Sequence, residues 1–199
     1  MKIIVISGPS GSGKTCLSNK LSKSLNNSIV IKTDSYYKDN IFIRFLSIFL
    51  YDIYDRLFSI KKNEIMSTIE SIYNKDILIP FSHYNFKNKH SSKSSVCINY
   101  NIKNQFLLIE GIFSHRLDLN YQETVNIVCR EEQEICFKRR LKRDKLERGR
   151  DSREVYKKFN KSWFLFYENI PDYIQNNNVV SLNPSDKYSC EKLVKNIQK

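Results

Sequence analysis

The sequence is short of glycine, of paired cysteines and of long apolar runs. Only five of its 199 residues are glycine, below the average usage of about 7%, so each glycine is expected to mark a backbone position that requires one. This scarcity also excludes a collagen-like or glycine-rich disordered chain. With 41% hydrophobic and 27% charged residues, the composition predicts one globular domain over residues 1–199.

Cysteine usage argues against a disulfide framework and against a zinc site. The cysteines are odd in number, scattered and form no CxxC pair, and we expect each to be a small buried hydrophobe with a reduced thiol: Cys16, Cys97, Cys129, Cys136 and Cys190.

No apolar run is long enough for a bilayer span. The most apolar later stretch, residues 41–51, contains Arg44, whereas a span needs about twenty apolar residues. The apolar start, residues 1–7, is too brief for a signal peptide and runs into Gly8-Pro9. We therefore expect a cytoplasmic location and no membrane partner.

The sequence carries an excess of basic residues. Lys and Arg number 33 against 21 Asp and Glu, a formal net charge of +12. Three interpretations stay open: a nucleic-acid surface, attraction of an anionic small-molecule substrate, and a lysine-rich solvated surface without a specific partner. No recognised nucleic-acid motif accompanies the charge, so nucleic acid is not the favoured partner.

Short apolar runs alternate with segments of helical spacing. This alternation predicts an α/β fold, with a parallel sheet of about five strands and helices on both faces. The expected strands are 3–7, 28–33, 105–109, 124–129 and 178–182, and segments 76–84 and 94–100 are expected to pair as a hairpin. The expected helices are 14–25, 41–58, 64–73, 131–146, 153–168 and 188–197.

One segment matches a phosphate-binding motif in full. Residues 8–15 fit G-x-x-x-x-G-K-[ST] and lie between an expected strand and an expected helix, which predicts a P-loop NTPase. The backbone of the loop would cradle the phosphates of ATP or GTP, Lys14 would reach the β and γ phosphates, and the Thr15 hydroxyl would bind Mg²⁺. The residues expected to hold the nucleotide in this loop are Gly8, Ser10, Gly11, Ser12, Gly13, Lys14 and Thr15.

Two acidic residues follow expected strands at the same edge of the sheet. Asp34 comes after the second strand, where a carboxylate can orient a substrate hydroxyl and accept its proton, although a turn cap is the alternative. Glu110 ends the strand 105–109 and is placed to hold Mg²⁺ or its water; the alternative is an acid without a ligand. Gly111 would then let the chain turn away.

An arginine-rich segment ends at a glycine. Helical spacing puts Arg139 and Arg143 on one face, and Gly149 breaks the helix, so Arg148 and Arg150 are expected on a mobile lid over about residues 143–154. Arginine suits a transferring phosphoryl group because its charge is fixed and its donors are forked. The alternative is a solvated basic helix with local ion pairs.

Together these segments resemble the uridine kinase family, which also includes phosphoribulokinases and nicotinamide riboside kinases. The resemblance runs from about Lys2 to Asp151, with weaker matching to the end, and Glu147-Arg148-Gly149-Arg150-Asp151 is its most specific part. The other segments that carry it are 8–15, 33–38, Ile79-Pro80, Tyr84-Asn85-Phe86 with His90, and 108–112.

The resemblance implies transfer of a phosphoryl group from ATP or GTP, with Mg²⁺, to a nucleoside 5′-hydroxyl. It makes Asp34 the catalytic base and places Tyr37 at the nucleoside. Asp55, or alternatively Asp52, would grip the ribose hydroxyls. The remaining implied residues are Tyr84, Phe86 and His90 for the base, within a substrate-binding insertion at about 36–101, and Arg140, Arg143, Arg148 and Arg150 for the lid and phosphates.

Three departures from the family pattern fall on base recognition. Asn85 replaces an aspartate, His90 stands one residue further from Tyr84, and Lys158 stands where a glutamine is expected. Uridine or cytidine is the first expectation, with ribosyl nicotinamide and a sugar phosphate such as ribulose 5-phosphate open. A nucleotide-dependent nucleic-acid-binding protein is the alternative from another class, and the sequence leaves the oligomeric state open, a homo-oligomer included.

Overall fold

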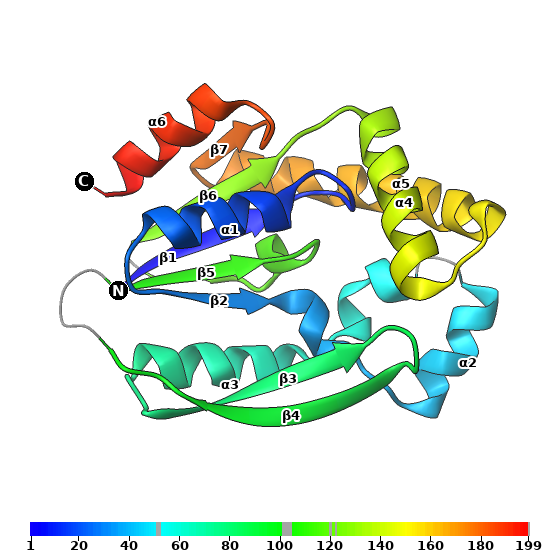
Figure 1. Ribbon diagram of the computed structural model, residues 1–199, viewed down its shortest axis with the longest axis horizontal. Coiled ribbons are helices and arrows are strands. Elements are labelled where there is room, and N and C mark those ends of the chain that lie inside the picture. The colour runs from blue at the N-terminus through cyan, green and yellow to red at the C-terminus, as the bar shows by residue number, and fades with distance from the viewer. Residues whose placement is uncertain (51–52, 101–104, 120, 122, 199) are drawn as a thin grey trace.

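The computed structural model describes residues 1–50, 53–100, 105–119, 121 and 123–198. Its main sheet has five strands in the order β2-β5-β1-β6-β7, and every neighbouring pair is parallel. A separate antiparallel hairpin, β3 with β4, lies below the β2 edge in Figure 1. The strands are β1 Lys2–Ser7, β2 Ser28–Lys32, β3 Leu78–Asn85, β4 His90–Cys97, β5 Phe106–Glu110, β6 Thr124–Cys129 and β7 Val179–Leu182.

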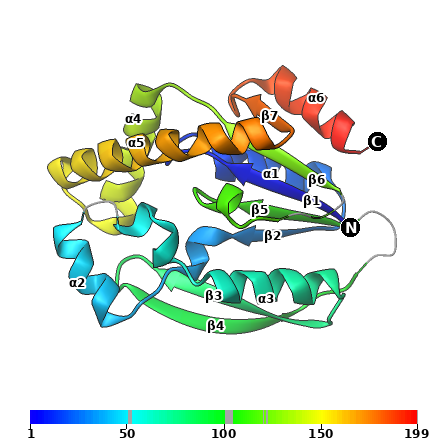
Figure 2. The same cartoon turned by 180° about the vertical axis from the view of Figure 1, so that it is seen from behind.

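Helices cover both faces of the sheet, as the front and back views show (Figures 1 and 2). Helices α1 and α6 pack on one face, and α3 and α5 pack on the other. The predicted fold class is therefore confirmed. The helices are α1 Lys14–Ser24, α2 Ile41–Phe49, α3 Lys62–Tyr73, α4 Gln133–Arg148, α5 Ser152–Asn176 and α6 Lys187–Ile197.

Strand β1 shows why both faces must be covered. Ile3 and Val5 pack into the core formed with α3 and α5, whereas Ile4 and Ile6 pack into the core formed with α1 and α6. Successive side chains of a strand point to opposite faces, so a continuous apolar run needs an apolar layer on each side. Strand β1 is thus buried on both faces, and the loop that follows it begins from a buried position.

The expected helix over 41–58 is wrong in its second half. Helix α2 ends at Phe49, and short 3₁₀ turns follow at Ile53–Asp55 and Leu57–Ser59. The chain then pairs with residues 36–38: Lys38 N donates to Ser59 O at 2.8 Å and Lys61 N donates to Tyr36 O at 2.8 Å. These two bonds tie the chain directly after the expected helix to the residues at and after the end of the 3₁₀ turn Thr33–Tyr36.

The expected helix over 153–168 is too short. Helix α5 continues through Pro171 to Asn176, although a proline removes one helical hydrogen bond. Burial of Phe166 and Ile170 and a 2.6 Å hydrogen bond from the Tyr173 hydroxyl to Asn126 Oδ1 anchor it on both sides of the proline. Tertiary contacts therefore override the local break.

Two further expectations concern the burial of the cysteines and the absence of a bilayer-spanning segment. Cys129, Cys136 and Cys190 are buried and all five thiols are free, but Cys16 and Cys97 are exposed, so the expectation of burial is wrong for these two. None of the helices in the described part of the chain combines the length and apolarity that crossing a bilayer requires.

Candidate active site

The loop after β1 has the geometry of a phosphate cradle. Gly11 and Gly13 adopt φ angles of 90° and 91°, and a Cβ at Gly11 would come within 2.2 Å of the Cys136 carbonyl oxygen. No side chain within the described residues caps the N-terminus of α1, so its first N–H groups and its positive dipole end face the loop. The Lys14 ammonium donates to Pro9 O at 2.9 Å, and this holds it over the loop.

A hydroxyl and a carboxylate meet beside this loop. The Thr15 hydroxyl donates to Glu110 Oε1 at 3.0 Å. Glu110 is 5% exposed, and burial raises its pKa against the opposing effect of the Lys14 ammonium. Mg²⁺ prefers oxygen ligands and is usually bound by one or two carboxylates together with substrate phosphates and water. The pair therefore fits one side of such a site, and the described residues hold no cluster of three or more His, Cys, Asp or Glu that could hold a metal alone.

Asp34 carries an acceptor atom without a partner. It lies in the 3₁₀ turn Thr33–Tyr36 that follows β2, and its Oδ1 is buried without a hydrogen-bond partner among the described residues. A buried carboxylate oxygen without a donor is costly unless a ligand completes it. Asp34 is therefore chemically suited to receive a hydroxyl or a metal-bound water.

Gly111 brings the two acidic strands close together. Strands β2 and β5 pair in register, with Lys32 opposite Glu110. A Cβ at Gly111 would come within 1.8 Å of Thr33 Oγ1. Since only glycine leaves room for that hydroxyl, the turn after Glu110 and the turn carrying Asp34 can both face the same opening.

One cavity of about 270 Å³ gathers most of the predicted site residues. It contacts the phosphate loop, both acidic residues, the aromatic residues of the insertion and the arginines of α4. Its lining is Ser10, Gly11, Gly13, Lys14, Thr15, Cys16, Asp34, Tyr37, Tyr54, Phe86, Glu110, Ile112, Arg139, Arg140, Arg143, Arg148, Arg150 and Lys158.

Among the predicted residues whose side chains the structure describes, four are not part of this lining: Gly8, Ser12, Tyr84 and His90. Tyr84 is buried behind it and its ring lies 5.1 Å from that of Phe86, and Gly8 is buried beneath the loop. His90 lies on β4 with 66% of its side chain exposed, and its Nδ1 is 3.4 Å from the Asp39 carboxylate. The Asp55 backbone belongs to the 3₁₀ turn after α2, and its alternative, Asp52, lies outside the described residues.

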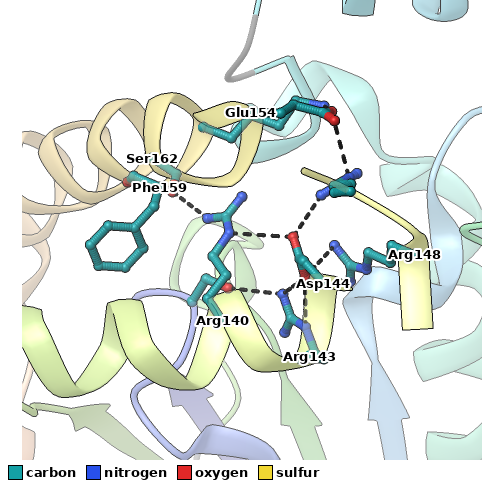
Figure 3. Close-up of polar contacts among 10 residues, drawn as sticks. Arg140, Arg143, Asp144, Arg148, Glu154, Phe159 and Ser162 are labelled. Carbon is teal, nitrogen blue, oxygen red and sulfur yellow. Dashed lines mark hydrogen bonds and ion pairs between the residues drawn. The ribbon is translucent and has the colours of Figure 1, made fainter. Parts of the chain in front are cut away.

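Asp144 lies at the centre of the arginine cluster (Figure 3). Its side chain is fully buried, and guanidinium nitrogens of four arginines approach its carboxylate: Arg140 at 3.8 Å, Arg143 at 2.8 Å, Arg148 at 3.6 Å and Arg150 at 2.8 Å. Burial alone would raise the pKa of Asp144, but the charges of Arg148 and Arg143 hold it below its usual value.

The same cluster reaches the phosphate loop and the insertion. Arg143 donates to Ser10 Oγ at 3.3 Å, and the Arg148 guanidinium lies 3.8 Å above the centre of the Phe86 ring. Gly149 ends α4 in the left-handed conformation, with φ 62°, which turns Arg150 back toward Asp144. The expected lid arginines are therefore drawn together around one acid.

Sequence reasoning missed the position of Asp144 at the centre of the arginines and the place of Tyr54 in the cavity lining. Asp144 follows Arg143 directly and reads as a local ion pair in a basic helix, so its convergence with Arg148 and Arg150 was not visible. Tyr54 lies in a segment expected to be helical. Arg139 was singled out by its helical spacing alone, although it donates to Gly11 O at 3.3 Å.

The parallel sheet, the glycine loop with its lysine and the acidic strand end define a P-loop kinase fold. Comparison with known proteins identifies the family to which this fold belongs. The chain belongs to the phosphoribulokinase/uridine kinase family, whose model matches residues 3–180, and it is thereby a small-molecule phosphotransferase.

Individual relatives agree with this assignment. A curated uridine kinase from Staphylococcus aureus is 30% identical over 161 residues, which span 79% of this chain and 75% of that protein. A solved structure described as a possible uridine kinase from Bacillus stearothermophilus aligns with a TM-score of 0.54 at 18% identity and covers 91% of this chain and 88% of its own. The structure of the YGR205w protein aligns with a TM-score of 0.60 at 13% identity, over 92% and 86% of the two chains. These two structures support the fold alone.

Proposed function

We propose that this protein transfers the γ-phosphoryl group of ATP to the 5′-hydroxyl of a nucleoside, with uridine or cytidine as the first candidates. The observation that carries the proposal is the buried, unpartnered Oδ1 of Asp34 beside the cavity that Lys14 also lines. A phosphoryl acceptor needs a base within hydrogen-bond reach of its hydroxyl, and a structural turn cap would have its acceptor atoms filled.

The donor phosphates bind along the loop. Backbone N–H groups of residues 8–15 and the open end of α1 hold them, and Lys14 turns from Pro9 O to the β and γ oxygens. Thr15 and Glu110 would hold Mg²⁺, and their oxygen atoms meet at 3.0 Å beside the loop. When bound, the ion neutralises charge on the phosphates and orients them.

The acceptor hydroxyl gives its proton to Asp34. As the new P–O bond to the 5′-oxygen forms, the bond between the γ-phosphorus and the bridging oxygen breaks, and ADP leaves. Arg148 and Arg150, at the centre of the proposed lid over about 143–154, stabilise the charge on the transferring group. The four-arginine cluster also excludes water, which would otherwise take the phosphoryl group.

Aromatic residues favour a nucleoside as acceptor. Tyr37 and Phe86 line the cavity with ring centres 5.7 Å apart, and Tyr54 is 5.4 Å from Tyr37. These rings provide an apolar wall for a base within the proposed insertion, 36–101, and Asp55 is proposed to hold the ribose. Ribosyl nicotinamide shares these features, whereas a sugar phosphate would leave the aromatic wall unused.

A substrate panel tests the proposal. Nucleosides, ribosyl nicotinamide and ribulose 5-phosphate are incubated with Mg-ATP, and ADP release and product mass are measured. We expect a nucleoside monophosphate, and we expect Asp34→Asn to lower kcat by about 10²–10⁴-fold while ATP binding, measured by calorimetry, stays near wild type. Near-normal turnover of this variant would show that Asp34 is not the base, and phosphorylation of ribulose 5-phosphate alone would refute the nucleoside assignment.

A further inference from the structure

A second cavity, larger than the first, lies on the α3 and α5 side of the sheet, the side that faces the viewer in Figure 2. Its volume is about 820 Å³, and among the described residues it shares no lining residue with the active-site cavity. It is formed by residues 56–64 around the start of α3, by Lys38 and Arg116, and by Leu165 and Asn169 of α5. Small-molecule sites commonly have volumes of about 300–1,000 Å³.

The charges that line this cavity are strongly one-sided. Its five cations face a single carboxylate, that of Glu64. That carboxylate is already engaged with the hairpin, because Ser82 donates to it at 2.7 Å and the Lys93 ammonium lies 3.0 Å away. The cations are Lys38, Arg56, Lys61, Lys62 and Arg116.

Two of the five cations have no counter-charge. Lys61 lies 3.8 Å from the Asp39 carboxylate, and Lys62 lies 3.1 Å from that of Asp118. Within the described part of the chain, by contrast, the side chains of Lys38 and Arg116 make no ion pair or hydrogen bond. An anion between these two side chains would supply the missing charge.

Two further features of the cavity wall favour an anionic ligand that also has an apolar part. No side chain in the described chain caps α3 at Lys61, so the positive end of the helix dipole faces the same opening. The apolar part of the wall consists of Leu57, Phe58, Ile60 and Leu165, and Phe58 is 44% exposed. A planar apolar group could lie against this aromatic ring.

We propose that this basic cavity binds a phosphorylated small molecule with a planar or apolar body, at a site separate from the active site. The phosphate contacts Lys38 and Arg116, and the body lies on Phe58. Short stretches of chain link the site to both acidic residues of the active site, because Lys38 lies four residues after Asp34 and Arg116 lies six residues after Glu110. Binding there is therefore expected to change the rate of phosphoryl transfer.

The test measures binding to the full chain with the active site filled by Mg²⁺ and a non-hydrolysable ATP analogue. Inorganic pyrophosphate and adenosine 5′-monophosphate are titrated by calorimetry. We expect one additional site for each probe. Replacing Lys38→Ala together with Arg116→Ala should weaken it at least tenfold, since each removes a charge-assisted contact. Lys14→Ala, measured without the analogue, should retain this site and lose the phosphate-loop site.

A matched control removes two exposed lysines from remote helices, Lys23→Ala with Lys192→Ala, and circular dichroism verifies that every variant is folded. Equal weakening by this control would reduce the effect to non-specific attraction and overturn the proposal. The proposal would also be overturned if no additional site were found at millimolar probe concentration, or if Lys14→Ala alone abolished that site. Binding of pyrophosphate without the monophosphate would overturn the part assigned to Phe58. The proposed nucleoside kinase activity is tested separately, because its assay measures product formation and not binding to this cavity.

Discussion

Asp144→Asn is the sharpest perturbation that the arginine cluster offers. The substitution keeps the shape of the side chain and removes one charge from a site where four guanidinium groups lie within 3.8 Å. The four cations then lose the carboxylate that they share, although Arg150 keeps an acidic neighbour, Glu154 at 3.8 Å. Breaking a buried ion pair by removing one partner costs about 3–5 kcal/mol, and we expect this range because Asp144 is fully buried.

Thermal unfolding is the assay. At this chain length each kcal/mol shifts Tm by about 2–4 °C, so Asp144→Asn should lower Tm by roughly 6–20 °C. Glu134→Gln is the matched control: it makes the same chemical change on the same helix, but Glu134 is exposed and its 2.6 Å ion pair with Lys138 lies in solvent. Exposed pairs contribute little, so its Tm should stay near wild type.

Acid titration gives a second readout. The pKa of Asp144 is lowered from 3.8 in the folded protein, so its ionised form stabilises the fold. This stabilisation is complete above about pH 4 and is lost as the pH falls through the lower folded pKa. Asp144→Asn should therefore flatten the loss of stability below pH 4. A Tm within 2 °C of wild type, with an unchanged acid profile, would refute the argument that Asp144 holds the arginines together.

The remaining predictions concern the active-site cavity. Glu110→Gln removes the charge of a proposed Mg²⁺ ligand, so the Mg²⁺ concentration for half-maximal ADP release should rise at least tenfold, and an unchanged Mg²⁺ dependence would exclude Glu110 as a ligand. Cys16 is exposed and lines the cavity, so iodoacetamide should modify it and Mg-ATP should slow the reaction. Burial raises the pKa of the Cys129 thiol to about 12 and that of Cys136 to about 11, so both should stay unmodified in peptide mass analysis; labelling of Cys16 at the same rate with and without nucleotide would contradict its position. Asp55→Ala should raise KM for the nucleoside and leave KM for ATP unchanged, and if both stay at wild-type values, Asp52 becomes the residue to test.

The fold could be predicted from the sequence because its signals are local. Ile3 to Ile6 form a continuous apolar run that stops at a glycine loop, and the other strands of the main sheet are also short and largely apolar. Asp34 and Glu110 could be selected because carboxyl ends of parallel strands share one edge. The motif around Lys14 needed no tertiary information at all.

Two features escaped prediction because they depend on contacts between distant segments. The helix expected over 41–58 ends at Phe49, and the chain just beyond residue 58 pairs with residues 36–38, a contact that local spacing does not reveal. Asp144 is surrounded by basic residues in the sequence, and it becomes a centre only because Gly149 reverses the chain and returns Arg150 to it. The assignment of His90 to the nucleobase stays a prediction, and the structure adds only that the hairpin sets its ring beside Asp39.

The contact between Gly111 and Thr33 makes the spacing of the two carboxylates that line the cavity, Asp34 and Glu110, depend on the absence of a side chain at position 111. Any side chain at position 111 would wedge β5 away from the β2 turn and carry Glu110 away from Asp34. A smaller residue at position 33 would relieve the clash at its origin. The two positions are therefore coupled, and a substitution at Gly111 is expected to be tolerated better in a chain whose residue 33 is smaller than threonine.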